Sequence, residues 1–299
     1  MYFPFLPLSW TCSNNLEEEI RNIKLPLSPS KWLYYANFKE LPTKQTFLQQ
    51  LPKSIFLRGL SSFHKKKLRL DHEFLFIGKE ALLDLEVDHF SKKSLIDLVR
   101  RGKRHGTTSE LQHTNESITL LELFKDECSH SHEPQLKYLF SDYFSKNERL
   151  FIFGEGGTVW GAIVTSLNSP QKVHTELLLR RKNAPIGIME ALIYDIFTIL
   201  KKEGESKYLS LGEVPFVDGN SHINLKNKLI LKAGKSLRIV YNYQGLYKFK
   251  NKFQPEWQDV FIAETGKVRF RTLFGVALQS NLLALTLFKL KRLFFSPFT

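Results

Sequence analysis

Residues 241–257 read Tyr-Asn-Tyr-Gln-Gly-Leu-Tyr-Lys-Phe-Lys-Asn-Lys-Phe-Gln-Pro-Glu-Trp, and lysines alternate with aromatic residues in the segment Tyr247–Phe253. In an extended chain this spacing places Lys248, Lys250 and Lys252 on one face and the aromatic side chains on the other. Three lysines on one face are suited to bind phosphate or carboxylate groups. A solvated edge strand protected by lysines shows the same pattern, so the segment alone leaves both interpretations open.

Length, composition and charge restrict the class of protein. A chain of 299 residues with 42% hydrophobic and 24% charged residues is typical of a globular protein with a sizeable core. The formal net charge of +13 favours a polyanionic partner, either nucleic acid or anionic lipid; the other interpretation is a charge that only keeps the protein in solution. Cys12 and Cys128 are too few for a disulfide framework, so we expect a cytoplasmic protein.

The common cofactor and metal motifs do not occur in the sequence. It contains no Gly-x-x-x-x-Gly-Lys phosphate loop, no Gly-x-Gly-x-x-Gly fingerprint and no Gly-x-Ser-x-Gly nucleophile elbow. His130 and His132 lie close to Cys128, but no second cluster completes a metal shell. We therefore expect neither a cofactor nor a metal.

The second half of the chain alternates between strand-like and helical patterns. The hairpin signal Gly154-Glu-Gly-Gly157 joins the first two predicted strands, and Gly187 and Gly204 bound a helix with apolar residues at helical spacing. The predicted strands are 150–153, 158–166, 173–181 and 208–211, the predicted helices are 188–202 and 226–234, and extended segments are predicted at 237–243 and 259–263.

The first half of the chain is less regular. We expect an N-terminal extension with one helix near Leu16–Ile23, then two short strands at Phe74–Ile77 and Leu82–Val87. A helix from Lys92 ends at Gly106, and its basic last turn is either ordinary helix-end chemistry or a phosphate-binding cluster.

The C-terminal segment Thr272–Phe288 is uncharged, rich in Leu and Phe, and flanked by basic residues on both sides. A membrane-spanning helix needs about 20 apolar residues, and Gln279-Ser-Asn281 interrupts this segment near its middle. An interfacial anchor on anionic headgroups fits the pattern better. A last helix packed on the body of the protein is the equally open alternative.

Tyr241–Trp257 closely resembles a signature of the phosphatidylglycerol lysyltransferase family, the lysyl- or alanyl-phosphatidylglycerol synthases linked to resistance against cationic antimicrobial peptides. The resemblance covers roughly residues 70 to 265. The matching motifs, in chain order, are Gly78-Lys-Glu-Ala81, Ala184-Pro-x-Gly-x-Met-Glu190, Leu209-Ser-Leu-Gly212 with Pro215, Gln244-Gly-Leu, Phe249-Lys-x-Lys-Phe253 and Pro255-x-Trp257.

This resemblance implies an α/β (α+β) fold of two tandem GNAT-like acyltransferase units, with mixed central sheets flanked by helices and the active site in the second unit. We expect an extension at 1–45, a first unit at 46–145, a second and catalytic unit at 146–266, and an apolar and basic tail at 267–299. The order of the predicted elements in the second half agrees with one such unit.

The resemblance also implies the reaction and its residues. An amino acid esterified to tRNA is already activated, so its transfer to a phosphatidylglycerol-like lipid needs no nucleotide site. Lys250 and Lys252 are expected on phosphate or on the developing oxyanion, and Arg180 is expected as a third catalytic residue. The expected substrate-binding residues are Glu176, Glu190, Glu213, Gly212, Gln244, Gly245 and Lys248.

One departure from the family pattern bears on the substrate. The family has an arginine after an Asp-Leu-Met triplet, whereas this chain reads Glu176-Leu-Leu-Leu-Arg180, so the acid is one residue out of register or missing. The transferred amino acid therefore stays open. Glu190 and Glu213 are candidates to replace the missing acid. The alternative interpretation of Glu190 is an ordinary acid in the first turn of a helix, and that of Glu213 is a loop residue.

The sequence leaves two other functions open. The same fold could serve a GNAT-type acyltransferase acting on another amine or hydroxyl, and a degenerate domain could bind only tRNA or membrane. For the leading function we expect aminoacyl-tRNA and anionic phospholipid as partners. We expect the chain in the cytoplasm, peripheral on the inner face of the cell membrane through the C-terminal tail.

Overall fold

The computed structural model describes residues 5–14, 17–43, 47, 53–68, 72–141, 143–217, 225–236 and 241–295. Its strands are β1 (Thr11–Cys12), β2 (Glu19–Lys24), β3 (Lys31–Phe38), β4 (Ile55–Ser61), β5 (His72–Asp84), β6 (Thr107–Leu111), β7 (Glu148–Glu155), β8 (Thr158–Ser169), β9 (Lys172–Arg180), β10 (Tyr208–Pro215) and β11 (Glu256–Thr265). Its helices are α2 (Ser62–Lys67), α3 (Lys93–Gly102), the 3-10 turn η1 (Lys103–His105), α4 (Asn115–Asp126), α5 (Ile188–Glu203), α6 (Leu225–Ser236), α7 (Tyr243–Asn251), α8 (Phe270–Gln279) and α9 (Leu282–Phe295).

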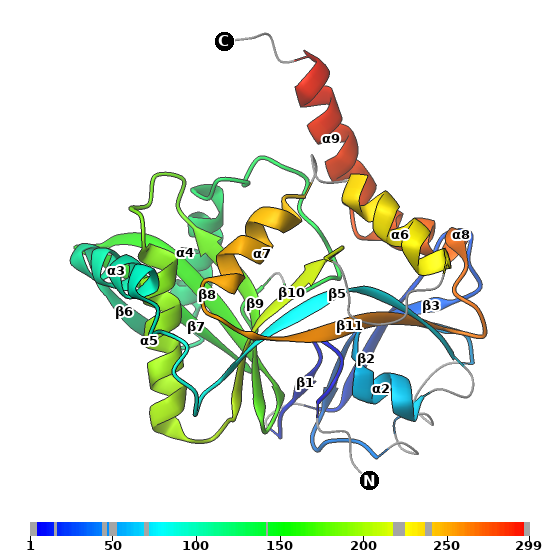
Figure 1. Ribbon diagram of the computed structural model, residues 1–299, viewed down its shortest axis with the longest axis horizontal. Coiled ribbons are helices and arrows are strands. Elements are labelled where there is room, and N and C mark those ends of the chain that lie inside the picture. The colour runs from blue at the N-terminus through cyan, green and yellow to red at the C-terminus, as the bar shows by residue number, and fades with distance from the viewer. Residues whose placement is uncertain are drawn as a thin grey trace.

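The described strands form one mixed sheet that runs through the molecule (Figure 1). The order is β1-β3-β4-β11-β5-β10-β9-β8-β7-β6, with β2 added on β3. The long strand β5 lies at its centre, because it pairs antiparallel with β10 on one side and with β11 on the other. Strands from both ends of the sequence are therefore neighbours in the sheet.

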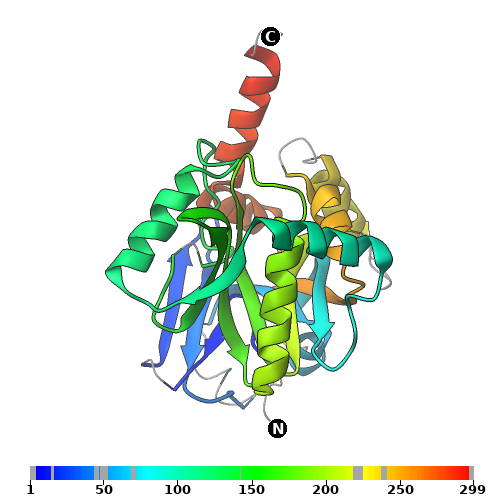
Figure 2. The same ribbon diagram turned by 90° about the vertical axis from the view of Figure 1, so that its left-hand side faces the viewer.

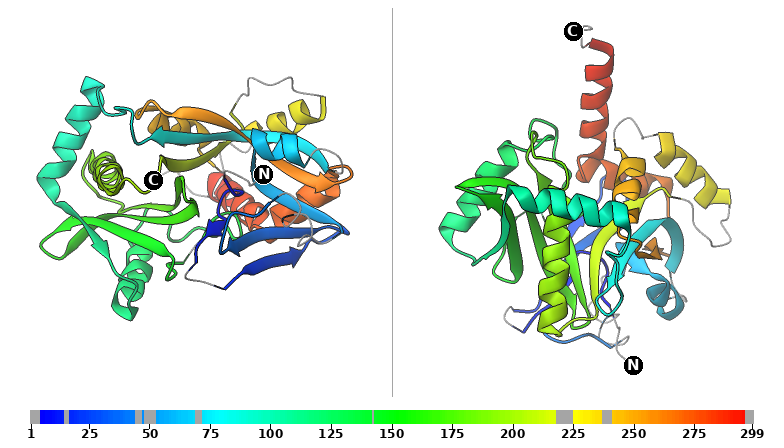
Figure 3. Two further views of the ribbon diagram at one scale, coloured as in Figure 1. Left: turned by 90° about the horizontal axis from the view of Figure 1, so that it is seen from below. Right: turned by 60° about the vertical axis from the view of Figure 1, so that its left-hand side comes forward.

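The sheet curls on itself, as the view from below shows (Figure 3). Strand β1 comes to lie against β8, and the side-chain amide of Asn168 on β8 donates to the carbonyl oxygens of Pro7, at 2.9 Å, and Trp10, at 3.0 Å. The concave side of this curl holds buried polar side chains as well as the aromatic core around Trp10 and Phe47.

Helices cover both faces of strands β7 to β9 (Figure 2). Alternation along β7 places Phe151 and Phe153 in one core with α3 and α5, whereas Leu150 packs with α4 on the opposite face. Helix α5 begins after Gly187 and ends at Gly204, and both glycines adopt positive φ angles, as the sequence predicted for its two ends. This packing fixes the frame on which β9 and β10 are held.

The predicted hairpin of β7 and β8 is confirmed, as are the predicted helix ending at Gly106 and the predicted helix at 226–234. Two predictions in the first half are wrong. Residues 19–23 of the predicted N-terminal helix belong to the strand β2, held by its pairing with β3. The two short strands predicted between 74 and 87 are one strand, β5, which ends at Asp84 and has both of its edges paired. Long-range pairing overrides local propensity in both places.

The prediction of an extended chain through Tyr247–Phe253 is also wrong, because α7 covers Tyr243–Asn251. The Asn242 side chain caps this helix by accepting from the backbone N–H of Gly245 at 2.9 Å. Buried residues Tyr243, Lys250 and Phe253 follow helical spacing, which competes with the alternation read from the sequence. Of the predicted extended segment at 237–243, residues 237–240 lie outside the described residues.

The C-terminal segment forms two helices with an angle of 71° between them at the Ser280–Asn281 break. Helix α8 packs on the body of the protein, where Gly275 lies against the backbone of Pro26, and α9 projects beyond the rest of the fold (Figure 1). No single described helix is long and apolar enough to cross a membrane, although α8 and α9 together reach the required length and composition as a bent pair.

Candidate active site

Strands β9 and β10 separate in the middle of the sheet. They pair in parallel only from Tyr208 with Lys172 to Ser210 with His174, after which β9 stays with β8 and β10 follows β5. The pairing of β10 with β5 shifts register between Ser210 and Glu213, where Gly212 has a φ angle of +82°. Because such a φ favours glycine, the sequence Leu209-Ser-Leu-Gly212 builds the separation into the strand.

Helix α7 brings Lys250 to this separation. Its Nζ donates to the backbone carbonyl of Glu213 at 2.9 Å, and the side chain is only 3% exposed. A Cβ on Gly212 would lie 3.5 Å from Lys250 Nζ and 3.7 Å from His174 Cε1. The place where β9 and β10 separate, at Ser210, Gly212, His174 and Lys250, is named the strand gap.

Burial controls the protonation of the two bases at the strand gap. Loss of water lowers the pKa of Lys250 to about 7, against the opposing attraction of Glu213 and Glu80. The pKa of His174 lies well below its usual value, first because of burial and then because of the positive charges of Lys172, Lys250 and Arg58. The strand gap therefore presents a neutral imidazole beside an amine that changes charge near neutral pH.

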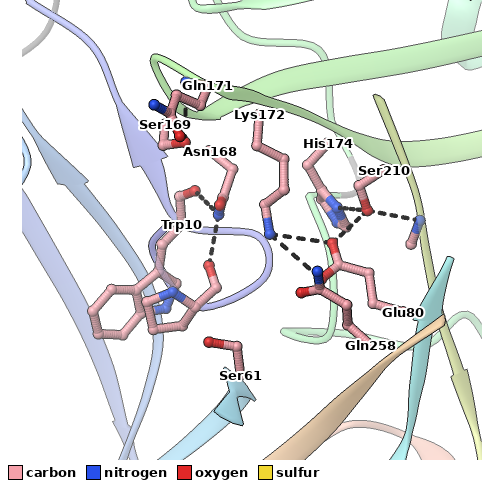
Figure 4. A network of polar contacts seen from close by, with 12 residues as sticks. Trp10, Ser61, Glu80, Asn168, Ser169, Gln171, Lys172, His174, Ser210 and Gln258 are labelled. Atoms are coloured by element: carbon pink, nitrogen blue, oxygen red, sulfur yellow. Dashed lines mark hydrogen bonds and ion pairs between the residues drawn. The ribbon is translucent and has the colours of Figure 1, made fainter. Parts of the chain in front are cut away.

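A buried polar network of Lys172, Glu80 and Ser210 contacts His174 at the strand gap (Figure 4). The ammonium of Lys172 lies 3.2 Å and 3.4 Å from the two carboxylate oxygens of Glu80, with both side chains almost fully buried. The Ser210 hydroxyl donates to Glu80 Oε1 at 2.5 Å and lies 3.1 Å from His174 Nδ1. The backbone N–H of Gly212 also donates to the Ser210 hydroxyl, at 3.1 Å.

Glu213 presents an unusual carboxylate next to the strand gap. Its Oε1 is paired with the guanidinium of Arg58 on β4, which also donates to the carbonyl oxygen of Leu139 at 2.7 Å. Its Oε2 is buried and has no hydrogen-bond partner among the described residues. A buried acceptor without a partner costs free energy, so this oxygen is suited to accept from a ligand.

Glu176 lies farther along β9 in a second acidic site. It accepts from the hydroxyl of Ser166 at 2.6 Å and from the backbone N–H of Ser141 at 3.0 Å. Burial raises its pKa. Burial, followed by the charge of Glu176, raises the pKa of neighbouring Glu148 to about 7. Ser141 also lines a cavity of about 210 Å³ whose walls include Tyr34, Tyr35, Tyr138, Tyr143 and Arg21.

The other predicted site residues lie around α7 and α5. Lys252 forms an ion pair with Glu190 in the first turn of α5, with Nζ and Oε1 at 2.6 Å. Arg180 is exposed at the end of β9 and donates to the carbonyl oxygen of Ala184 at 2.7 Å. No recorded contact between described residues joins Arg180 or Glu176 directly to Lys250.

Gln244, Gly245 and Lys248 occupy the early turns of α7. A Cβ on Gly245 would lie 2.5 Å from the amide nitrogen of Asn242, so this glycine leaves room for the helix cap. Lys248 is exposed and points away from the buried Lys250, since two residues along a helix turn the side chain by about 200°. The structure thus separates the three lysines that an extended chain would have aligned.

The structure adds five polar residues that the sequence analysis missed: Arg58, Glu80, Lys172, His174 and Ser210. One signal was present, because His174 and Glu176 alternate in the predicted strand 173–181 and Lys172, directly before it, continues the same spacing, so the three share one face. A strand face with three ionisable residues is unusual for a buried sheet. Among the described residues no group of His, Cys, Asp or Glu is arranged to hold a metal ion.

Comparison with known sequences assigns this architecture to a family. Residues 82–264 match the family described as "Phosphatidylglycerol lysyltransferase, C-terminal". The phosphatidylglycerol lysyltransferase of Bacillus subtilis (strain 168) is 25% identical over 235 residues, which cover 73% of this chain and 27% of the relative. The chain therefore spans about a quarter of the length of that relative.

Solved structures share the fold. L-PGS from Bacillus licheniformis superposes with a TM-score of 0.66 at 18% identity, over 92% of this chain and 89% of the other. The C-terminal domain of a protein described as a lysylphosphatidylglycerol synthetase, from Agrobacterium fabrum, gives 0.67 at 17% identity, over 91% and 87%. FemX gives 0.51 at 8% identity, over 82% and 83%. The predicted fold class, a mixed α/β fold of tandem GNAT-like units, is confirmed.

Proposed function

The chain belongs to the phosphatidylglycerol lysyltransferase C-terminal domain family, and we propose that it transfers an amino acid from aminoacyl-tRNA to an anionic phospholipid similar to phosphatidylglycerol. The observation that carries the proposal is the strand gap, where the amine of Lys250 and the ring of His174 come close to each other beside Gly212. Acyl transfer needs a donor for an oxyanion and a base close together.

The proposed reaction has an attacking hydroxyl, a developing oxyanion and a leaving group. The glycerol hydroxyl of the lipid attacks the ester carbonyl, and negative charge develops on the carbonyl oxygen. The ammonium form of Lys250, which is populated near neutral pH because the pKa is about 7, donates to this oxygen, and the developing negative charge strengthens the hold of the amine on its proton. Collapse of the intermediate breaks the bond to the ribose oxygen of the tRNA, which leaves with a proton.

The carboxylates supply the contacts to the amino acid. Glu213 Oε2, which lacks a hydrogen-bond partner among the described residues, is placed to accept from the α-ammonium of the aminoacyl group. Glu176 and Glu190 are the further candidate carboxylates, and Arg180, Lys248 and Lys252 are exposed or half-exposed cations suited to tRNA or lipid phosphates. Gly245 holds the first turn of α7 through its bond to Asn242 and so positions Lys250, and Gln244 lies in the same turn. We also propose that the first and the second GNAT-like units meet near residue 145.

A surface on α8 supports contact with the membrane. Phe270, Phe274 and Leu278 recur every fourth residue and are exposed. The inward side of the same helix packs Leu273 and Val276 on the core, so α8 is apolar on its outer side as well as on its inner side. This outward apolar stripe therefore marks a surface that is suited to an apolar partner.

The turn between β2 and β3 adjoins this stripe and extends it. Leu27 is 68% exposed at the tip of the turn and has a φ angle of +63°, which is strained for leucine. Lys24, Leu27 and Arg271 line one hollow, and no ion pair between described residues involves either cation. Leu27, Phe270, Phe274 and Leu278 with Lys24 and Arg271 form the α8 surface, which fits an anionic lipid headgroup layer. We place the chain at the inner face of the cell membrane through this surface and α9.

The test uses labelled aminoacyl-tRNAs, presented one at a time with vesicles that contain phosphatidylglycerol, followed by lipid extraction. The proposal predicts one labelled lipid, absent when the tRNA is digested with RNase beforehand and absent with vesicles of phosphatidylcholine alone. Transfer that survives RNase and tRNA removal would replace the proposal with an acyltransferase using another donor. Saturable tRNA binding without turnover of any aminoacyl-tRNA would replace it with a binding domain.

A further inference from the structure

His174 is held in a defined protonation state by the buried network. Glu80 lies against the ammonium of Lys172 and receives the Ser210 hydroxyl at 2.5 Å, so its carboxylate oxygen accepts. The hydroxyl has one proton, and that proton is directed to Glu80. The contact of 3.1 Å between Ser210 Oγ and His174 Nδ1 then requires the proton to come from Nδ1.

The coordination of the Ser210 hydroxyl supports this direction. Its oxygen donates once, to Glu80, and accepts twice, from the Gly212 N–H at 3.1 Å and from His174 Nδ1–H at 3.1 Å. One donated and two accepted bonds use the whole capacity of a hydroxyl group. If Nδ1 accepted instead, Ser210 Oγ and Glu80 Oε1 would meet at 2.5 Å without a proton between them.

This tautomer leaves the other ring nitrogen, Nε2, with a free lone pair. No hydrogen bond recorded between described residues uses Nε2. The adjacent ring atom Cε1 borders the strand gap, at 3.7 Å from the position of a Cβ on Gly212, and Lys250 Nζ lies 3.5 Å from the same position. A hydrogen-bond donor, the amine of Lys250, and a base, the His174 ring, therefore lie close together beside Gly212.

We propose that Glu80, Ser210 and His174 form a proton relay in which His174 Nε2 takes the proton of the attacking acceptor hydroxyl. The role as a base rests on the proposed function, and the tautomer does not. As the acceptor oxygen bonds to the acyl carbon, its proton moves to Nε2, and Ser210 and Glu80 stabilise the resulting imidazolium through Nδ1–H. When the acyl carbon releases the ribose oxygen, Nε2 returns the proton to that oxygen, so the residue ends unchanged.

The tautomer is tested by NMR on protein labelled with ¹⁵N in its histidines, with His174 assigned from the spectrum of His174→Asn. The relay predicts a neutral ring with a proton on Nδ1 and a bare Nε2, constant between about pH 6 and 8. Ser210→Ala removes the acceptor of Nδ1–H, so its His174 should populate the Nε2-protonated form as well. A wild-type ring that carries its proton on Nε2, or that is charged at neutral pH, overturns the relay.

The role as a base is tested by turnover of His174→Asn in the lipid transfer assay. The asparagine amide can replace Nδ1–H as the donor to Ser210 but offers no base at the position of Nε2. The relay predicts a loss of at least about 100-fold in kcat with the fold retained in circular dichroism. His64→Asn is the matched control, because His64 is equally buried but bonds to Ser61 on β4; it should keep its turnover.

The outcomes separate the relay from the transfer reaction. An active His174→Asn enzyme overturns the role of His174 as the base. A wild-type chain with the expected tautomer that transfers no amino acid contradicts the proposed function, because the hydrogen-bond geometry would be correct without that reaction. If the wild-type chain transfers an amino acid while His174 carries its proton on Nε2, the relay is wrong and the proposed function stands.

Discussion

Lys250 and Phe274 have opposite environments: the lysine is 3% exposed at the strand gap, whereas the phenylalanine is 47% exposed on α8. At the strand gap the fold buries ionisable groups, and on the α8 surface it exposes apolar side chains next to cations. Burying a charge and exposing an apolar stripe both cost free energy of folding. The chain thus gives up stability both at the site where the proposed reaction needs ionisable groups and at the surface where it needs contact with lipid.

The largest expected effect on stability comes from Lys250→Met. The pKa of Lys250 is about 7 in the folded protein, below the value of 10.5 for a free lysine. Between these values the unfolded state binds more protons, so wild-type stability should rise with pH, by roughly 2 kcal/mol between pH 7 and 9 relative to the variant. Below about pH 7 the penalty is complete and Lys250→Met should be the more stable protein.

Urea unfolding of both proteins from pH 6 to 9 measures this difference. The subtraction removes other titrating groups such as Glu148, whose pKa is also about 7. A constant difference across this range would mean that Lys250 does not titrate at the strand gap.

The next largest effect is expected for a substitution of Gly212 at the strand gap. Gly212→Ala places a methyl group at a φ of +82°, in contact with Lys250 Nζ and His174, so we expect a loss of about 1–2 kcal/mol in unfolding free energy and a clear fall in kcat. Gly156→Ala is the matched control, since its φ is +58° and nothing lies within 4 Å of the new methyl group. Thermal unfolding should show similar losses for both, and only Gly212→Ala should lose turnover. Equal turnover would argue against the gap as the reaction site.

A third prediction concerns the α8 surface. Phe274→Ser and Leu27→Ser should each weaken binding to phosphatidylglycerol vesicles by about 1–2 kcal/mol, because each side chain loses contact with the lipid. Their unfolding free energy should change by less than about 0.5 kcal/mol, since both residues are exposed. Vesicle cosedimentation at two salt concentrations measures the binding.

Leu123→Ser provides the control for that surface, because Leu123 is 63% exposed on α4. It should bind vesicles as the wild type does. If it weakens binding as much as Phe274→Ser, the α8 surface is not the docking site. Self-association that Phe274→Ser abolishes, without a change in vesicle binding, would assign the surface to a second copy of the chain.

The smallest effect on turnover is expected for Lys252→Ala. The lysine is 41% exposed but its partner Glu190 is 7% exposed, so the substitution leaves a buried carboxylate without its partner and should cost about 1–2 kcal/mol of stability. If Lys252 contacts a substrate phosphate, KM for tRNA or lipid should rise a few-fold while kcat is kept. A large loss of kcat in steady-state kinetics would move Lys252 into the catalytic group.

Local signals in the sequence were sufficient for part of the fold. The glycines of the β7–β8 hairpin and those that bound α5 act within a few residues, so their elements could be predicted. The alternation in Tyr247–Phe253 was misleading because Lys250, a polar residue, occupies a buried position of α7. A hydrophobic pattern cannot reveal a helix whose inward face includes a lysine.

The family resemblance made part of the site predictable. Gly212 and Lys250 belong to its motifs, Glu213 follows Gly212 directly, and the three meet at the strand gap. Glu80 and Ser210 also lie in motif segments, but their contact with each other and with Lys172 arises only through the order of β5, β10 and β9. Arg58 reaches Glu213 in the same way, across the curl of the sheet.

The most direct test of the account is a side-by-side measurement of kcat for Lys248→Ala, Lys250→Ala and Lys252→Ala, with the same aminoacyl-tRNA and phosphatidylglycerol vesicles. The three lysines would act together on an extended strand, and α7 separates them. If Lys250 is the oxyanion donor, Lys250→Ala should lose about 100- to 1000-fold in kcat, and the other two variants should lose less than about threefold. Equal losses for all three variants, or full turnover by Lys250→Ala, would contradict the account.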